Sequence, residues 1–277
     1  MGWLEILVLA VVQGLTEFLP VSSSGHLVVA NAVLERLGMP PAKDLVEVSI
    51  ALHLGTLASV LVYYRREVAR LLGEDRRVLP LLIVGTIPAA VVGVGLKKGL
   101  PETASDAVLE NVLLAGLMFP VTAAILWAAS RRTEGDEEYR RISWVRALLV
   151  GAAQALAILP GVSRSGATIA AGLGVGLGRE SASTFAFLLA IPAILGAGVL
   201  EGLDVLKDGS TGTPIDRLAV GFAVSFAVGW AALALLIRFV KRGRLAVFGW
   251  YLVPLGVAVV AGVLGFGLGS PASGSGG

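Results

Sequence analysis

Five long stretches of this sequence contain no Asp, Glu, Lys or Arg, and few folds can accommodate them. They are residues 78–96, 111–130, 181–200, 218–237 and everything from 245 onward. Each is close to the roughly 20 residues that a helix needs to cross a hydrocarbon core of about 30 Å. Residues 48–64 form a sixth such stretch, interrupted only by His53. The sequence therefore predicts a protein that crosses a membrane several times.

The composition agrees with this prediction and restricts the secondary structure. Of the 277 residues, 56% are hydrophobic and 15% charged, and the mean hydropathy is +0.83. Lipid offers the backbone no hydrogen-bond partner, so a spanning segment must be a helix or part of a closed barrel. Continuous apolar runs do not fit the alternating pattern of barrel strands. We therefore expect an all-α integral membrane protein with about six transmembrane helices and no nucleic-acid partner.

Basic residues predict how the chain is oriented. They gather in the connections at 65–77, 131–146 and 238–244, which we expect to be cytoplasmic because cytoplasmic loops are enriched in Lys and Arg. The intervening connections are sparser, with Arg36 and Lys43, Lys97 and Lys98, and Lys207 and Arg217. This alternation requires residues of about 3–37 to enter and leave on the outer side, and about 146–178 on the inner side. We interpret both segments as re-entrant helical hairpins of two short helices each, although two full crossings would give the same parity.

The two hairpins contain the main polar segments of the apolar chain, and they resemble each other. Residues 13–26 read QGLTEFLPVSSSGH and residues 160–168 read PGVSRSGAT. A shift of 141 positions places Gln13 on Gln154, Ser22 on Ser163 and Gly25 on Gly166. Three crossings follow each hairpin, and this odd number turns the second copy upside down. We expect an inverted repeat of residues 1–141 and 142–268 within one membrane domain, followed by a disordered tail at 269–277.

Polar groups inside a membrane mark a functional site by default, because each is costly unless it faces a partner, a ligand or water. Gln13 and Glu17 share a helix face, and Pro20 ends that helix. The serines that follow are candidate caps of the next helix, whose free N–H groups favour an anion. Arg164 adds a guanidinium group that matches phosphate geometry. With His26 within reach, these groups suit metal-assisted phosphoryl transfer, which we take as a hypothesis.

At these residues the sequence resembles the undecaprenyl-diphosphatase family, the membrane proteins of bacitracin resistance. Both polar segments match the family signatures almost letter for letter, and the likeness continues through residues 183–192, STFAFLLAIP. The resemblance implies hydrolysis of undecaprenyl diphosphate to the monophosphate and inorganic phosphate. This reaction recycles the lipid carrier of cell-wall synthesis. The resemblance also implies Mg²⁺ or Ca²⁺ as cofactor and a multi-pass position in the plasma (inner) membrane, with the site open to the extracytoplasmic side.

The family's catalytic positions carry over to Glu17, Ser23, His26 and Arg164. We assign Ser23 as nucleophile, Glu17 as metal ligand or base, His26 as proton donor or acceptor and Arg164 as the clamp for transition-state charge. Ser23 and His26 could exchange roles. Gln13 replaces the first glutamate of the family pair, which weakens a two-carboxylate metal site. The expected substrate-binding residues are Gln13, Ser22, Ser24, Gly25, Ser163, Ser165, Gly166 and Thr168, and the second-tier candidates are Glu47 and His53. Position 53 is more often Gln in the family, which argues against an essential imidazole there.

Two other functions are weighed against the phosphatase. The inverted repeat is also typical of transporters, so a transporter or flippase of polyprenyl phosphate is the alternative. Transport of an anion requires Arg164 and helix ends but no nucleophile, so Ser23, His26 and Glu17 distinguish the two. An ion channel fits worst because no long polar pore face is present. The expected partners are a polyprenyl diphosphate lipid and the membrane, and a homodimer is compatible with the sequence.

Overall fold

A computed structural model describes residues 2–37, 45–99, 101–133, 135–208 and 212–269. Over these residues the chain is helical and no strand is formed, apart from one isolated bridge between Glu137 and Leu177. The predicted tail lies outside the described residues except for Gly269, as does Lys43. The helices are α1 (Trp3–Phe18), α2 (Ser23–Arg36), α3 (Leu45–Tyr63), α4 (Arg65–Leu71), α5 (Val78–Gly99), α6 (Glu102–Leu109), α7 (Val112–Ser130), η1 (Tyr139–Arg141), α8 (Trp144–Leu156), α9 (Arg164–Gly174), α10 (Arg179–Asp208), α11 (Ile215–Lys241) and α12 (Ala246–Phe266).

The predicted apolar stretches match the long helices. In the described part of the chain, α5, α7, α10, α11 and α12 are each long and apolar enough to cross a membrane. Helix α3 gives a sixth candidate when it is taken together with α4, from which it is bent by 81°. The prediction of an all-helical protein with about six spans is therefore confirmed at the level of helix length and composition.

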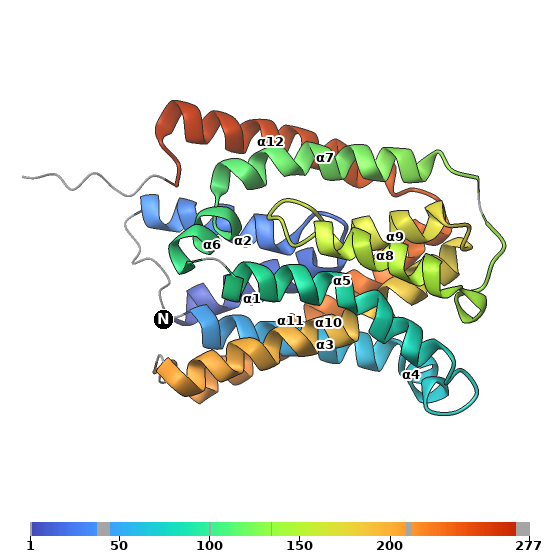
Figure 1. Ribbon diagram of the computed structural model, residues 1–277. Helices are drawn as coiled ribbons and strands as arrows, with labels where there is room; N and C mark the ends of the chain where they lie inside the picture. Colours follow the sequence, from blue (N-terminus) through green and yellow to red (C-terminus); the bar gives the residue numbers. More distant parts are fainter. Residues whose placement is uncertain (1, 38–44, 100, 134, 209–211, 270–277) are drawn as a thin grey trace, which may run out of the picture.

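The long helices lie side by side, with the shorter helices α1, α2, α8 and α9 among them (Figure 1). The most extensive contacts are those of α3 with α11, α7 with α12, α1 with α11, and α5 with α8. Small residues allow these approaches. A Cβ atom on Gly14 of α1 would lie 3.0 Å from the carbonyl oxygen of Ser225 on α11, and one on Gly151 of α8 would collide with Gly85 on α5.

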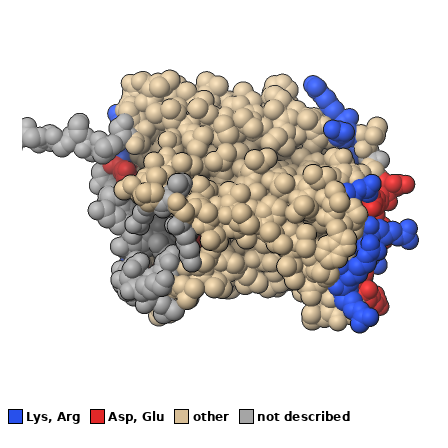
Figure 2. Space-filling view, viewed as in Figure 1, with Lys and Arg blue, Asp and Glu red and all other residues tan. Residues whose placement is uncertain are grey.

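The short helices form two pairs, and each pair occupies a different half of the molecule. Helices α1 and α2 lie in the half that holds the N-terminus, whereas α8 and α9 lie in the opposite half (Figure 1). The Lys and Arg side chains visible in the same view gather at the α8 and α9 end (Figure 2). This distribution agrees with the basic connections that the sequence predicted for one side of a membrane.

Candidate functional site

The turn between α1 and α2 is fixed by Ser22. This residue is the N-cap of α2, and its Oγ accepts a hydrogen bond of 3.3 Å from the backbone N–H of Gly25. It adopts a φ of 72°, a backbone conformation that is uncommon for a residue other than glycine. Residues held in such conformations cluster at functional sites. The break between the two helices is short, because α1 ends at Phe18 and Ser23 already begins α2.

The turn between α8 and α9 repeats this arrangement. Ser163 is the N-cap of α9, and its Oγ accepts a bond of 3.1 Å from Gly166 N–H. Its hydroxyl also lies 3.1 Å from that of Ser165, just as the Ser22 hydroxyl lies 3.3 Å from that of Ser24. The serine cap predicted for the first turn is confirmed, and the second turn has the same kind of cap.

The two turns touch each other. The Oγ of Ser22 accepts a hydrogen bond of 3.1 Å from Gly161 N–H, 139 positions away. A Cβ atom on Gly25 would lie 2.8 Å from that same nitrogen. Reciprocally, a Cβ atom on Gly166 would lie 3.3 Å from Cβ of Pro20. The polar segments of the two halves are therefore joined at their turns.

Helix α7 supports this junction from outside. The hydroxyl of Thr122 donates to the carbonyl of Gly161 at 2.8 Å and accepts from Ser163 N–H at 3.1 Å. Thr122 is buried and was not identified from the sequence, where it is one residue of an apolar span. A threonine that bonds to a turn far away in the sequence has no distinguishing local pattern.

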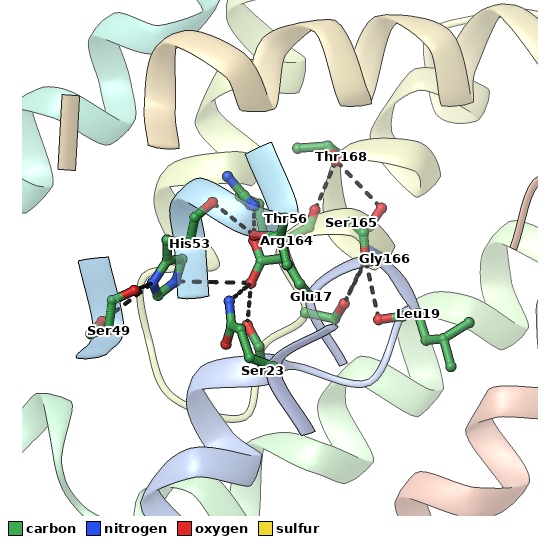
Figure 3. A network of polar contacts seen from close by, with 12 residues as sticks. Glu17, Leu19, Ser23, Ser49, His53, Thr56, Arg164, Ser165, Gly166 and Thr168 are labelled. Atoms are coloured by element: carbon green, nitrogen blue, oxygen red, sulfur yellow. Dashed lines mark hydrogen bonds and ion pairs between the residues drawn. The ribbon is translucent and has the colours of Figure 1, made fainter. Parts of the chain in front are cut away.

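Glu17 is the centre of a polar cluster formed by both halves (Figure 3). Its side chain is 4% exposed, and its Oε1 forms an ion pair with Nη2 of Arg164. Its Oε2 accepts hydrogen bonds from Ser23 Oγ at 2.7 Å and from Gln13 Nε2 at 3.0 Å. The structure thus brings together Glu17, Ser23 and Arg164, three of the four predicted catalytic residues, with Gln13 as an additional partner.

His53 approaches the same carboxylate from α3. Its Nδ1 lies 2.8 Å from the carbonyl oxygen of Ser49, so this nitrogen is the donor, and its Nε2 lies 4.0 Å from Glu17 Oε2. Of the second-tier residues, His53 therefore borders the cluster (Figure 3). Glu47 lies in the first turn of the same helix.

His26 belongs to a separate group of contacts. Its Nδ1 lies 2.7 Å from the carbonyl oxygen of Ser22, and its Nε2 lies 2.8 Å from the hydroxyl of Tyr251 on α12. The ring is stacked on Tyr251 and meets Phe119 edge-on, with centroid distances of 5.8 and 5.2 Å. Among the hydrogen bonds of the described residues, none joins His26 to Ser23 or Glu17. We did not identify Tyr251 or Phe119 from the sequence, because aromatic residues are common in membrane helices.

Two further predicted substrate-binding side chains also form hydrogen bonds within the protein. Thr168 Oγ1 donates to the carbonyl of Arg164 at 2.7 Å, within its own helix. Ser165 Oγ donates to the carbonyl of Leu19 at 3.4 Å. Both hydroxyls therefore donate to backbone carbonyls in this structure. That they contact a substrate stays a prediction.

The repeat-related glutamines differ in their surroundings. Gln13 and Gln154 are both buried, yet Gln13 donates to Glu17 whereas neither polar atom of the Gln154 amide has a partner in the described part of the chain. Only the first copy carries a carboxylate at the following helical turn. The two copies therefore repeat in sequence at this position but differ in the contacts of the side chain.

The donor set restricts how a cation could bind. No group of three or more His, Asp or Glu side chains suited to a metal occurs among the described residues. Glu17 is the carboxylate of the cluster, and one or two carboxylates completed by substrate phosphates are the usual ligands of Mg²⁺. These residues fit a cation that is held jointly with a phosphorylated ligand, and they do not form an all-protein cage.

The fold and the site define the class of this protein. It is a multi-pass helical membrane protein with a polar centre where two broken helix pairs meet, and this centre combines a carboxylate, a hydroxyl and a guanidinium group. The chain belongs to the family described as Bacitracin resistance protein BacA, whose pattern matches residues 6–258.

Curated relatives match over nearly their whole length. An undecaprenyl-diphosphatase of Rhodopirellula baltica is 48% identical over 258 residues, which cover 93% of this chain and 96% of the relative. A protein of the same name from Desulfatibacillum aliphaticivorans is 40% identical, and the match covers 95% of this chain and 98% of the relative. Another from Carboxydothermus hydrogenoformans is 38% identical, and the match covers 94% of this chain and 97% of the relative. The resemblance identified from the two polar segments is therefore confirmed.

Proposed function

We propose that this protein hydrolyses undecaprenyl diphosphate to undecaprenyl phosphate and inorganic phosphate. This would recycle the lipid carrier of cell-wall synthesis and confer resistance to bacitracin. One observation carries the proposal beyond family membership: Ser23 Oγ donates to Glu17 Oε2 at 2.7 Å, while Arg164 pairs with the other oxygen of the same carboxylate. A hydroxyl bonded to a carboxylate is an activated nucleophile, and the adjacent guanidinium suits a phosphate.

The reaction then takes two steps. Glu17 accepts the Ser23 proton as Oγ attacks the distal phosphorus, and the anhydride bond breaks to release the lipid monophosphate. Water then hydrolyses the phosphoserine, and the proton returns to Ser23. Arg164 stabilises the negative charge on the transferring phosphoryl group. Transport alone would not require a hydroxyl bonded to a carboxylate, so this contact favours hydrolysis over the transporter alternative.

His26 is the alternative nucleophile, and the chemistry of a trapped intermediate distinguishes it from Ser23. A phosphoserine is stable in acid, whereas a phosphohistidine is hydrolysed there and survives in alkali. We expect an acid-stable phosphoenzyme that His26→Gln still forms and Ser23→Ala does not. An acid-labile adduct that is lost in His26→Gln would reverse the assignment.

A divalent cation, Mg²⁺ or Ca²⁺, completes the proposal. Glu17 would hold it together with phosphate oxygens of the substrate, and the ion would neutralise charge on the diphosphate. We expect EDTA to suppress phosphate release and added Mg²⁺ or Ca²⁺ to restore it.

We also propose that α1 with α2 and α8 with α9 are re-entrant hairpins of an inverted repeat, in a plasma membrane protein whose site opens to the extracytoplasmic side. Reciprocal contacts support the repeat. Helix α1 packs on α11 and α8 on α5, so that in each half the first helix contacts the equivalent later helix of the other half.

Cysteine scanning of connections 65–77 and 238–244 with an impermeant thiol reagent tests the orientation, because the chain has no cysteine of its own. Both should be labelled only from the cytoplasmic side.

The decisive experiment is phosphate release from farnesyl diphosphate by the purified protein in detergent. It should be measured with and without EDTA for the wild type and for Ser23→Ala, His26→Ala and Arg164→Ala. Release that all three substitutions leave unimpaired would end the site assignment, and no release by the wild type from either farnesyl or undecaprenyl diphosphate would end the proposed function.

A further inference from the structure

Tyr251 lies outside both polar segments, yet it makes a specific contact with one of their predicted catalytic residues. Its hydroxyl is 2.8 Å from Nε2 of His26, and the two residues are 225 positions apart. Tyr251 is itself 48% exposed, in an α12 helix whose buried residues are Gly249, Leu252, Gly256 and Val259.

The other ring nitrogen determines the tautomer of His26. Nδ1 lies 2.7 Å from the carbonyl oxygen of Ser22, and a carbonyl can only accept a hydrogen bond. Nδ1 therefore carries the proton. In the neutral imidazole the lone pair is then on Nε2, and the Tyr251 hydroxyl is the donor to it.

The ring also has two aromatic neighbours. Tyr251 stacks on it with an interplanar angle of 14°, and Phe119 of α7 meets it at 65°. Two hydrogen bonds and two aromatic neighbours thus fix the orientation of the His26 ring. A histidine with only a packing role would not require a hydroxyl group that donates to its Nε2.

We propose that Tyr251 is a positioning residue for the phosphatase reaction, which directs the unprotonated Nε2 of His26 and holds it until substrate takes the place of the hydroxyl. The inference rests on the proposed function and adds α12 to the site. It assigns Tyr251 no direct contact with the reacting phosphorus.

Kinetics of Tyr251→Phe provide the first test, because this change removes the hydroxyl and keeps the stacked ring. Loss of one such hydrogen bond should lower kcat about 3- to 10-fold, with KM changed less than about twofold. In a His26→Gln background, Tyr251→Phe should have no further effect. Tyr63→Phe, which removes a tyrosine hydroxyl at the end of α3, is the matched control and should leave the kinetics unchanged. A rise in KM at constant kcat, or an equal loss with and without His26, would overturn the positioning role.

Nitrogen NMR provides a second test that does not depend on activity. The chain has two histidines, so His53→Gln leaves His26 as its only imidazole, provided that purification uses a tag without histidine. The ¹⁵N spectrum should show one protonated nitrogen and one unprotonated nitrogen that accepts a hydrogen bond, and Tyr251→Phe should shift only the latter. A protonated Nε2, or no response to Tyr251→Phe, would refute the proposal. Failure of the wild type to release phosphate would instead refute the proposed function, so the two outcomes are distinguishable.

Discussion

Gly25 of α2 lies so close to Gly161 of the α8–α9 turn that it has no room for a side chain. A Cβ atom on Gly25 would lie 2.8 Å from Gly161 nitrogen and 2.9 Å from the ring of Phe119. These atoms are backbone or packed aromatic carbon, so they cannot move without separating the two halves of the site. The junction thus depends on glycine for its geometry, in addition to the hydrogen bond from Gly161 to Ser22.

The first prediction is that Gly25→Ala impairs both activity and stability. Overpacking of this kind costs about 1 to 3 kcal/mol, and movement of Ser23 relative to Arg164 should reduce phosphate release at least about tenfold. Gly196→Ala is the matched control, since a Cβ atom there would meet nothing within 4 Å. It lies inside α10, where alanine should be neutral or stabilising. Equal behaviour of the two variants in thermal unfolding and phosphate release would contradict the account of the junction.

The second prediction separates stability from activity at the ion pair. Arg164→Ala leaves the Glu17 carboxylate buried without its cation, which should destabilise the protein by about 3 kcal/mol. Adding Glu17→Gln removes the unpaired charge, so the double variant should recover thermal stability and remain inactive. Recovery of phosphate release along with stability would mean that the pair is structural only.

Much of the fold could be predicted because each membrane-spanning helix is a continuous apolar stretch of the sequence. The stretches expected at 78–96 and 111–130 correspond to α5 and α7 almost residue for residue. The bend of 81° between α3 and α4 was not predicted, because the chain turns there at Tyr64 without a proline or glycine.

Some residues of the site could likewise be predicted from the sequence, and others could not. Glu17, Ser23 and Arg164 could be predicted because they stand in polar segments where lipid-facing sequence should be apolar. Tyr251 could not, since its role depends on α12 lying beside α7 and on a hydrogen bond across 225 positions. His26 was assigned to the site from the family resemblance and its nearness to the serines in sequence, and the structure places its Nε2 2.8 Å from the Tyr251 hydroxyl.

The third prediction contrasts the two repeat-related glutamines. Gln154→Leu should raise the unfolding temperature or leave it unchanged, because it removes a buried amide whose two polar atoms have no partner in the described structure. Gln13→Leu removes a donor to Glu17 and should lower phosphate release, by about 3- to 10-fold. If Gln154→Leu instead abolished release, the second copy would hold a functional group that these contacts do not reveal.

The fourth prediction concerns His53, whose Nε2 lies 4.0 Å from Glu17 Oε2. Glutamine is also polar, and its amide can present an N–H donor to the carboxylate, so His53→Gln should keep phosphate release within about threefold of the wild type. His53→Leu places an apolar side chain beside a buried carboxylate and should cost more, by roughly a further threefold, because no polar group then faces that charge from α3. Both rates should be measured at saturating farnesyl diphosphate so that substrate binding does not enter. Equal losses in the two variants would show that the imidazole itself is required, and would move His53 from a supporting to a catalytic position beside Glu17.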